Sequence, residues 1–316
     1  MLVDRREAIA LLGAAAASAA LASEPQASAA RRQRLFANLS AGAVGIRLSL
    51  EEAVTLAASH GFRGVDIGRA DAEAYGFERA RALLDQHNLV LGAWRLPVEY
   101  QGSDEEFHTS MKELPVHAAN LRKMGCRRFV NFLNPGSNEL AYKDNFARMA
   151  TRLREVGRVL AANGCVFGME FVGPKTSRAS FRYPFIWNLS GMLELCAAVG
   201  TGNMGVLIDS WHWYTSGGDI AQVRRLRPEQ VVYVHVNDAP KHVALDAQVD
   251  QARAMPMETG VIDLPSLLSA LDSIGYAGPV AAEVPNCSWA AVHANDAVRT
   301  VAATMRRAWR RARIPW

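Results

Sequence analysis

Short apolar runs alternate with longer stretches of helical periodicity from about residue 34 to the end of the chain. Uninterrupted apolar runs of this kind are typical of parallel strands that are buried on both faces. The pattern predicts strands at residues 35–39, 64–67, 89–94, 128–133, 166–170, 205–209, 231–235 and 280–283. It predicts helices at residues 49–61, 71–88, 104–125, 142–164, 189–199, 219–226, 264–274 and within 288–313. Ser103 is placed to cap the helix that begins at residue 104.

Eight strand–helix units in about 280 residues fit a (β/α)8 TIM barrel of ordinary size. A doubly wound sheet would also alternate strand and helix, but its first turn commonly carries a G-x-G-x-x-G motif. The first predicted turn, residues 38–45, contains glycine without matching that motif. With 316 residues, half of them hydrophobic, the chain is expected to form one large barrel domain over residues 31–316.

The first 30 residues have the composition of an export signal. Arg5 and Arg6 precede the alanine-rich run at residues 10–22, and small residues suited to cleavage follow. The paired arginines indicate a twin-arginine signal and predict a periplasmic protein. The apolar run is shorter than the roughly 20 residues that a membrane span needs, so no stable membrane anchor is expected.

The formal net charge of +4 comes largely from arginines near the two ends of the chain. We interpret the basic face of the last helix as a solvated surface, so no nucleic-acid partner is predicted. The four cysteines lie far apart without metal-binding spacing. They imply no disulfide framework, although a single disulfide stays possible. The sequence also leaves open whether the protein forms a homo-oligomer.

Four of the predicted strands end in a residue that can bind a metal: Glu170, Asp209, His235 and Glu283. The carboxyl ends of barrel strands meet at one face, so these four side chains are expected to surround one point. Alone, each could instead form a salt bridge or cap a helix. Together, three carboxylates and one imidazole favour a hard divalent cation, most of all Mn²⁺, with Mg²⁺ or Co²⁺ as alternatives.

Three further polar residues are candidates for the same site. His212 lies three residues after Asp209 and could hydrogen-bond a substrate hydroxyl or carbonyl, or pack among its aromatic neighbours. Asp238 lies three residues after His235 and could orient that imidazole, or bind metal or substrate itself. Arg253 could clamp a substrate oxygen or form a surface salt bridge.

Two long irregular stretches, residues 173–187 and 239–260, follow site-bearing strands, where barrels keep their substrate loops. Lys175 in the first stretch could recognise an acidic substrate or a second sugar ring, although such lysines are more often surface charges. Trp94 ends a strand and could form an aromatic wall against a sugar, or pack in the core.

These residues fall into four short motifs. They are D-x-x-H at 209–212, H-x-x-D at 235–238, an arginine-to-glycine loop at 253–263, and E-x-P at 283–285. As a set, over residues 35–312, they resemble the xylose-isomerase-like barrel superfamily of sugar isomerases, epimerases and inosose dehydratases.

The resemblance implies that the four strand-end residues hold the metal. It implies that Glu170 and Glu283 act as the acid–base pair, and that His212 and Arg253 contact the substrate, His212 assisting catalysis. Residues 257–259 depart from the family pattern, because relatives often have a shorter turn there. The departure predicts a differently shaped substrate pocket.

The sequence therefore predicts a metal-dependent isomerase or epimerase of a small carbohydrate: a non-phosphorylated sugar, keto-sugar or cyclitol. Its reaction would be proton transfer next to a metal-bound carbonyl. The same residues allow a lyase of the same barrel, either an inosose-type dehydratase or a 3-keto-glycoside or C-glycoside deglycosidase. An endonuclease of the AP-endonuclease type and a non-catalytic sugar-binding protein are weaker alternatives.

Overall fold

The computed structural model describes residues 34–289 and 291–316. The predicted signal peptide, residues 1–30, lies outside this range. The described residues form one compact unit that contains a large parallel sheet and a separate two-stranded antiparallel sheet. The strands of the large sheet are β1 Phe36–Leu39, β2 Gly64–Val65, β3 Val90–Leu91, β4 Trp94–Arg95, β5 Arg128–Leu133, β7 Val166–Phe171, β9 Met204–Asp209, β10 Val231–Val236 and β11 Pro279–Ala282. The small sheet pairs β6 Gly136–Ser137 with β8 Tyr183–Pro184.

The large sheet is a closed barrel. Its strands follow the order β3-β2-β1-β11-β10-β9-β7-β5-β4, and every pair is parallel. β3 and β4 are the two halves of one strand, interrupted at Gly92 and Ala93, so the two ends of this order meet. The predicted (β/α)8 barrel is thereby confirmed, and each predicted strand lies within a residue or two of an observed one.

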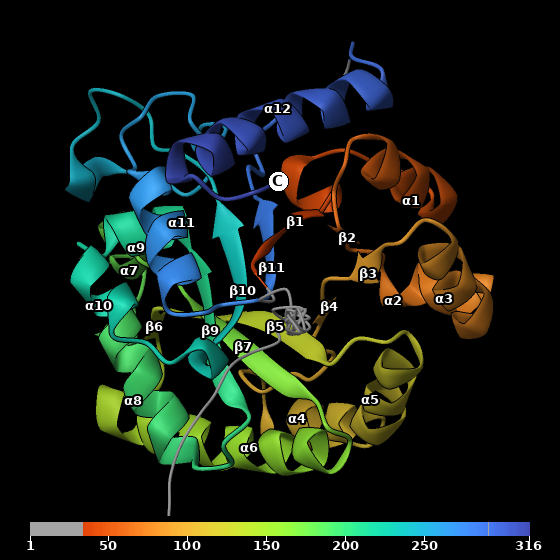
Figure 1. Cartoon of the computed structure of the whole chain (residues 1–316). Coiled ribbons are helices and arrows are strands. Elements are labelled where there is room, and N and C mark those ends of the chain that lie inside the picture. The colour runs from red at the N-terminus through yellow and green to blue at the C-terminus, as the bar shows by residue number, and fades with distance from the viewer. Residues whose placement is uncertain (1–33, 290) are drawn as a thin grey trace, which may run out of the picture. The chain divides into compact units, whose positions relative to one another are not determined.

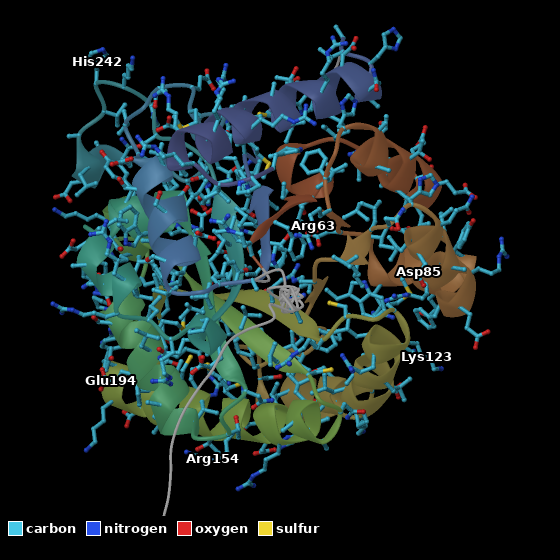
Figure 2. All side chains as sticks on the ribbon, in the orientation of Figure 1. Arg63, Asp85, Lys123, Arg154, Glu194 and His242 are labelled. Atoms are coloured by element: carbon cyan, nitrogen blue, oxygen red, sulfur yellow. The ribbon has the colours of Figure 1, made fainter. Side chains whose placement is uncertain are left out.

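The helices surround the barrel on its outside (Figure 1). They are α1 Leu50–Ser59, α2 Arg69–Tyr75, α3 Phe77–Gln86, α4 Asp104–Met111, α5 Leu114–Lys123, α6 Tyr142–Ala162, α7 Lys175–Arg178, α8 Leu189–Val199, α9 Ser210–Thr215, α10 Ile220–Arg224, α11 Leu264–Ser273 and α12 Ala294–Ala312, with short 3-10 turns at Gly42–Val44, Pro228–Gln230 and Leu245–Ala247. Their charged side chains, such as Asp85, Arg154 and Glu194, project outward (Figure 2). Their apolar faces pack on the strands to form the main core.

Two helices that the pattern predicts as continuous are each broken in the structure, so the predicted single helices at 71–88 and 104–125 are wrong. Gly76 separates α2 from α3 with a backbone φ of 91°, which glycine adopts without steric cost. Pro115 lies in the first turn of α5, where its missing N–H and fixed φ favour a new helix start over continuation of α4. The predicted Ser103 cap is confirmed, as a reciprocal capping box with Glu106.

A second, smaller apolar cluster fills the inside of the barrel below the carboxyl ends of its strands. It consists of Ala93, Leu207, Tyr233 and Ala281, with Val130 packed against it. The register of β10 against β9 shifts between Val231 and Tyr233. The cluster of Ala93, Leu207, Tyr233 and Ala281 is called the barrel floor below, because it lies beneath the strand-end residues.

The remaining sequence predictions concern thiols and membranes. All four cysteines are free, and Cys126 and Cys165 are buried. Among the described residues, no helix combines the length and the hydropathy that crossing a membrane requires.

Candidate metal centre and active site

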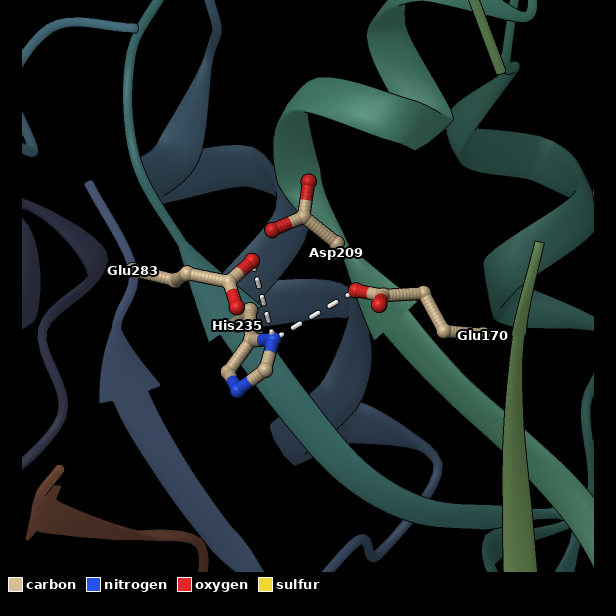
Figure 3. A group of neighbouring side chains, drawn as sticks. All are labelled: Glu170, Asp209, His235 and Glu283. Atoms are coloured by element: carbon tan, nitrogen blue, oxygen red, sulfur yellow. Dashed lines mark hydrogen bonds and ion pairs between the residues drawn. The ribbon is translucent and has the colours of Figure 1, made fainter. Parts of the chain in front are cut away.

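The structure brings the four strand-end residues together at one face of the barrel (Figure 3). Glu170, Asp209 and His235 end or nearly end β7, β9 and β10, and Glu283 directly follows β11. These strands are consecutive neighbours in the barrel. One ligand atom from each residue lies within 4.8 Å of the corresponding atoms of the others. His235 Nδ1 is 3.4 Å from Glu170 Oε1 and 3.3 Å from Glu283 Oε2.

The two-residue repeat of a strand explains why these side chains point inward together. Leu207, Tyr233 and Ala281 belong to the barrel floor, and each lies two residues before a cluster member. Alternate residues of a strand share a face, so a floor residue that points into the barrel directs the strand-end residue to the same side. The charged residues thus stand one layer above an apolar floor.

Asp209 serves the cluster and also caps a helix. Its Oδ1 accepts hydrogen bonds from the backbone N–H groups of Trp211 and His212, both at 2.8 Å, at the start of α9. Its Oδ2 accepts from Asn237 Nδ2 at 2.8 Å and from Arg253 Nη1 at 3.1 Å. These hydrogen bonds at the start of α9 fix the carboxylate in place.

Arg253 returns from the long loop after β10 to the centre of the cluster. Its Nη1 donates to Glu283 Oε2 at 2.7 Å as well as to Asp209, and its Nη2 donates to Asp250 Oδ1 at 2.6 Å. Its Nη2 also lies 3.0 Å from His212 Nε2. The Arg253 side chain is only 3% exposed, so its charge acts in a largely desolvated place. Arg253 and His212 are therefore both part of the assembled site.

The charges of the cluster set its protonation. Burial disfavours charge on the His235 imidazole, but Glu283 and Glu170 outweigh burial and raise its pKa well above the usual value. Burial and the nearby Glu283 raise the pKa of Glu170. Burial also acts to raise the pKa of Glu283, yet His235 and Arg253 outweigh it and lower that pKa. The two glutamates therefore have different proton affinities, although both contact the same imidazole.

This donor set fits a hard divalent cation. Three buried or partly buried carboxylates face only one permanent positive charge, the Arg253 guanidinium, so the cluster carries excess negative charge. A divalent cation bound together with a neutral His235 would offset most of that excess. Oxygen donors with one imidazole suit Mn²⁺, Mg²⁺ or a similar ion, and no thiol belongs to the group. The four residues of the group are those that would hold it.

Two cavities open onto the cluster. One, of about 620 Å³, is lined by Trp94, Asp66 and His235 among others. The other, of about 410 Å³, is lined by His212 and Arg253 with apolar groups around them. Glu170 and Glu283 line both cavities, so the two glutamates stand where the cavities meet.

Asp238 has a different role from the expected ones. It is fully buried, and its Oδ1 accepts from the backbone N–H groups of Ala239 and Ile262, both at 2.9 Å. Its Oδ2 accepts from the N–H groups of Thr259 and Gly260 at 3.0 and 2.7 Å. Since four backbone donors occupy this carboxylate, it anchors the loop that carries Arg253 instead of orienting His235 or meeting a substrate.

The structure does not bring Lys175 to the cluster. Its Nζ pairs with Asp246 Oδ2 at 2.7 Å, and both side chains are exposed. Trp94 does line the larger cavity, but it is almost fully buried and its indole N–H donates to the Ile67 carbonyl at 3.0 Å. It is part of the cavity wall and of the core at once.

Sequence reasoning missed two residues that hold the site together. Asn237 donates from its Nδ2 to Asp209 Oδ2 and to the Glu283 carbonyl oxygen at 3.1 Å, which links two cluster strands. Asp250 shares the Arg253 guanidinium. Asn237 could have been found, because it is a polar residue two positions after a predicted ligand at the end of an apolar strand. Asp250 could not, because it lies in a loop with no periodic pattern.

Comparison with known proteins identifies the family. A model described as the xylose isomerase-like TIM barrel matches residues 54–308. The chain belongs to the xylose isomerase-like TIM barrel family. A solved xylose isomerase domain protein from Alicyclobacillus acidocaldarius is 31% identical with a TM-score of 0.79, over 88% of this chain and 99% of that one.

Two further proteins are similar to this chain. An inosose isomerase of Bacillus subtilis is 26% identical over 153 residues, which is 48% of this chain and 51% of that protein. The chain thus matches about half the length of this curated relative. A solved IolI protein with a bound zinc atom is 18% identical with a TM-score of 0.74, over 87% of this xylose isomerase-like chain and 98% of that one. The second likeness shows the common fold.

Proposed function

We propose that this xylose isomerase-like barrel is a metal-dependent isomerase or epimerase of a non-phosphorylated keto-sugar or keto-cyclitol. The observation that carries the proposal is the pair of glutamates, Glu170 and Glu283, which face the same imidazole from β7 and from the end of β11. Two carboxylates around one point are what proton removal and proton return require. The inosose isomerase relative supports a carbonyl-bearing polyol as the substrate.

The residues divide the work of such a reaction. One glutamate takes the proton from the carbon beside a substrate carbonyl, and the other returns a proton to the same carbon or to its neighbour. Arg253 and His212, which are in contact with each other, are placed to hold substrate oxygens beside the glutamates. A bound divalent cation, for which we propose Mn²⁺, would polarise the carbonyl.

A lyase is the second candidate, and the two cavities favour it. Because Glu170 and Glu283 line both, a substrate with a sugar in one cavity and a leaving group in the other would place its reacting carbon between them. A 3-keto-glycoside has that shape. Proton removal beside its carbonyl would be followed by loss of the aglycone instead of proton return.

Deuterium exchange tests the proposed function. The Mn²⁺-loaded enzyme is incubated in D₂O with inosose, ribulose, allulose and aryl 3-keto-glucosides, and products are followed by NMR and mass spectrometry. We expect deuterium beside the carbonyl of a free ketose or inosose without other change of composition. Release of the aglycone would instead establish the lyase. Absence of exchange and of elimination with every substrate would contradict both candidates.

Location bears on the substrate class. The export prediction for residues 1–30 supports a non-phosphorylated substrate, because sugar phosphates are cytoplasmic metabolites. It stays a prediction, and cell fractionation of the full-length chain checks it.

A further inference from the structure

Besides its glutamates, the larger cavity is lined by an aspartate, Asp66, on the side of the barrel opposite to the strand of Asp209. Asp66 directly follows β2, and β2 lies four strand positions from β9 in either direction around the closed barrel when β3 and β4 are taken as one strand. Asp66 lines the same cavity as Glu170, His235 and Glu283, and it is partly exposed there. Neither the metal cluster nor the proton transfer proposed above uses it.

Asp66 is held in place by groups from three other strands. Tyr233 on β10 donates its hydroxyl hydrogen to Asp66 Oδ2 at 2.5 Å, and the Ala93 N–H between β3 and β4 donates to Asp66 Oδ1 at 3.1 Å. Asn38 on β1 donates to Tyr233 Oη at 2.8 Å, so the phenol accepts one hydrogen bond and gives its own hydrogen to the carboxylate. Tyr233 and Asn38 are almost completely buried. The network therefore fixes the direction of the carboxylate before any ligand arrives.

The backbone is shaped around this carboxylate. A Cβ at Gly92 would lie 2.3 Å from Asp66 Oδ1, so only glycine leaves room for it. The strand is interrupted at this point, and the Ala93 N–H turns to Asp66. Two members of the barrel floor, Tyr233 and Ala93, donate to this carboxylate, while the other floor residues are apolar. A desolvated charge is costly, which argues for a function at this position.

The Asp66 carboxylate offers about four acceptor positions, of which the Tyr233 hydroxyl and the Ala93 N–H take two. The side chains of Asn38 and Ser40 also interact with it, and the partly exposed part of the group remains open to a donor from the cavity. The open side of the group faces the cavity, whose volume of about 620 Å³ exceeds what a six-carbon polyol fills. The chemical class that presents O–H donors there is a polyhydroxylated compound. The donors would be hydroxyls remote from the reacting end, which lies at the glutamates.

We propose that Asp66, braced by Tyr233 and the Ala93 amide, is a hydroxyl-binding residue that anchors the end of the substrate remote from the metal cluster. It selects keto-sugars and keto-cyclitols that carry a hydroxyl at that end over their deoxy analogues. This inference rests on the proposed function for its substrate class. It concerns binding and positioning, and no proton moves at Asp66 during the reaction.

The test compares Asp66→Asn with the wild-type enzyme on inosose and on the deoxy-inososes that each lack one hydroxyl. Asparagine keeps the shape but replaces one acceptor oxygen by an NH₂ donor. We expect KM for inosose to rise by about 10- to 100-fold with kcat nearly unchanged, because a buried site built for a hydroxyl discriminates strongly. The deoxy-inosose that lacks the anchored hydroxyl should bind both proteins with the same weakened affinity. Asp85→Asn, at an exposed ion pair with Arg81, is the matched control and should change nothing.

Binding measurements separate this inference from the proposed reaction. Calorimetric titration of inosose and allulose into Glu170→Gln, with and without Asp66→Asn, reports affinity where no turnover occurs. Affinity that depends on Asp66, together with no exchange by the wild-type enzyme, would support the subsite while contradicting the reaction. Tyr233→Phe keeps the ring and removes only the donor to Asp66. It replaces Asp66→Asn as the test variant if that protein folds poorly, and it should also weaken binding. Equal losses for inosose and every deoxy analogue, unchanged affinity, or no binding of either probe to the parent protein would overturn the proposal.

Discussion

Substituting glutamine for Glu170 or Glu283 is expected to lower turnover by about 10³-fold, the size typical of a lost general acid or base. Glutamine has the shape of glutamate but does not accept or return a proton at neutral pH. Both side chains lie at the metal cluster, in contact with His235, where the proton transfer would take place. The measurement is the rate of deuterium exchange with inosose at saturating Mn²⁺, with circular dichroism to verify folding.

The two variants should differ in a second property. Glu283 Oε2 also accepts from Arg253 Nη1, so Glu283→Gln removes one negative partner of a buried guanidinium. The less compensated positive charge of Arg253 should then repel the cation, and Glu283→Gln should weaken metal binding more than Glu170→Gln. Glu194→Gln, on the exposed outer face of α8, is the control and should retain wild-type exchange. Wild-type turnover and metal content in both site variants would show that the acid–base assignment is wrong.

The second large effect is on stability. Asp238→Ala is expected to lower the free energy of unfolding by about 3–5 kcal/mol, because four backbone N–H groups around the fully buried carboxylate would lose their charged acceptor. The backbone of Asp238 also pairs with that of Ala254, next to Arg253, so loosening this loop should lower activity too. Chemical denaturation followed by circular dichroism measures the change.

Asp246→Asn is the matched control for this prediction. It removes a carboxylate from the same long loop, but Asp246 is exposed and its ion pair is with the exposed Lys175, so the expected loss is below about 0.5 kcal/mol. If Asp238→Ala were no less stable than Asp246→Asn, the four hydrogen bonds would not hold the loop as described.

The barrel could be predicted from the sequence because its strands are buried on both faces and therefore read as apolar runs between periodic helices. The breaks in the helices could not, since the apolar periodicity continues across Gly76 and up to Pro115. Only the backbone preferences of these two residues mark the breaks. The short helix α9 was also not predicted. Its six residues are almost all buried, so the sequence shows no alternation of apolar and polar faces there.

The four cluster residues were accessible to sequence reasoning because each ends an apolar strand, and strand ends meet at one face of a barrel. Asp238 shows where that reasoning fails. Its position three residues after His235 suggested a contact with the imidazole. Instead it accepts four backbone hydrogen bonds, three of them from residues 259–262 at the far end of the following loop, and no local sequence pattern reveals these donors. Asp66 likewise depends on a partner, Tyr233, that is distant in sequence.

Calorimetric titration of the metal-free protein with Mn²⁺ shows whether Glu170, Asp209, His235 and Glu283 hold one divalent cation. We expect one ion per chain. Because the raised pKa of His235 keeps its imidazole protonated without metal, binding should release about one proton near neutral pH, and affinity should fall as the pH is lowered. His235→Asn should lose most of the affinity and the proton release. If the wild-type protein did not bind the ion, or if His235→Asn bound it equally tightly, these four residues would not form a metal site.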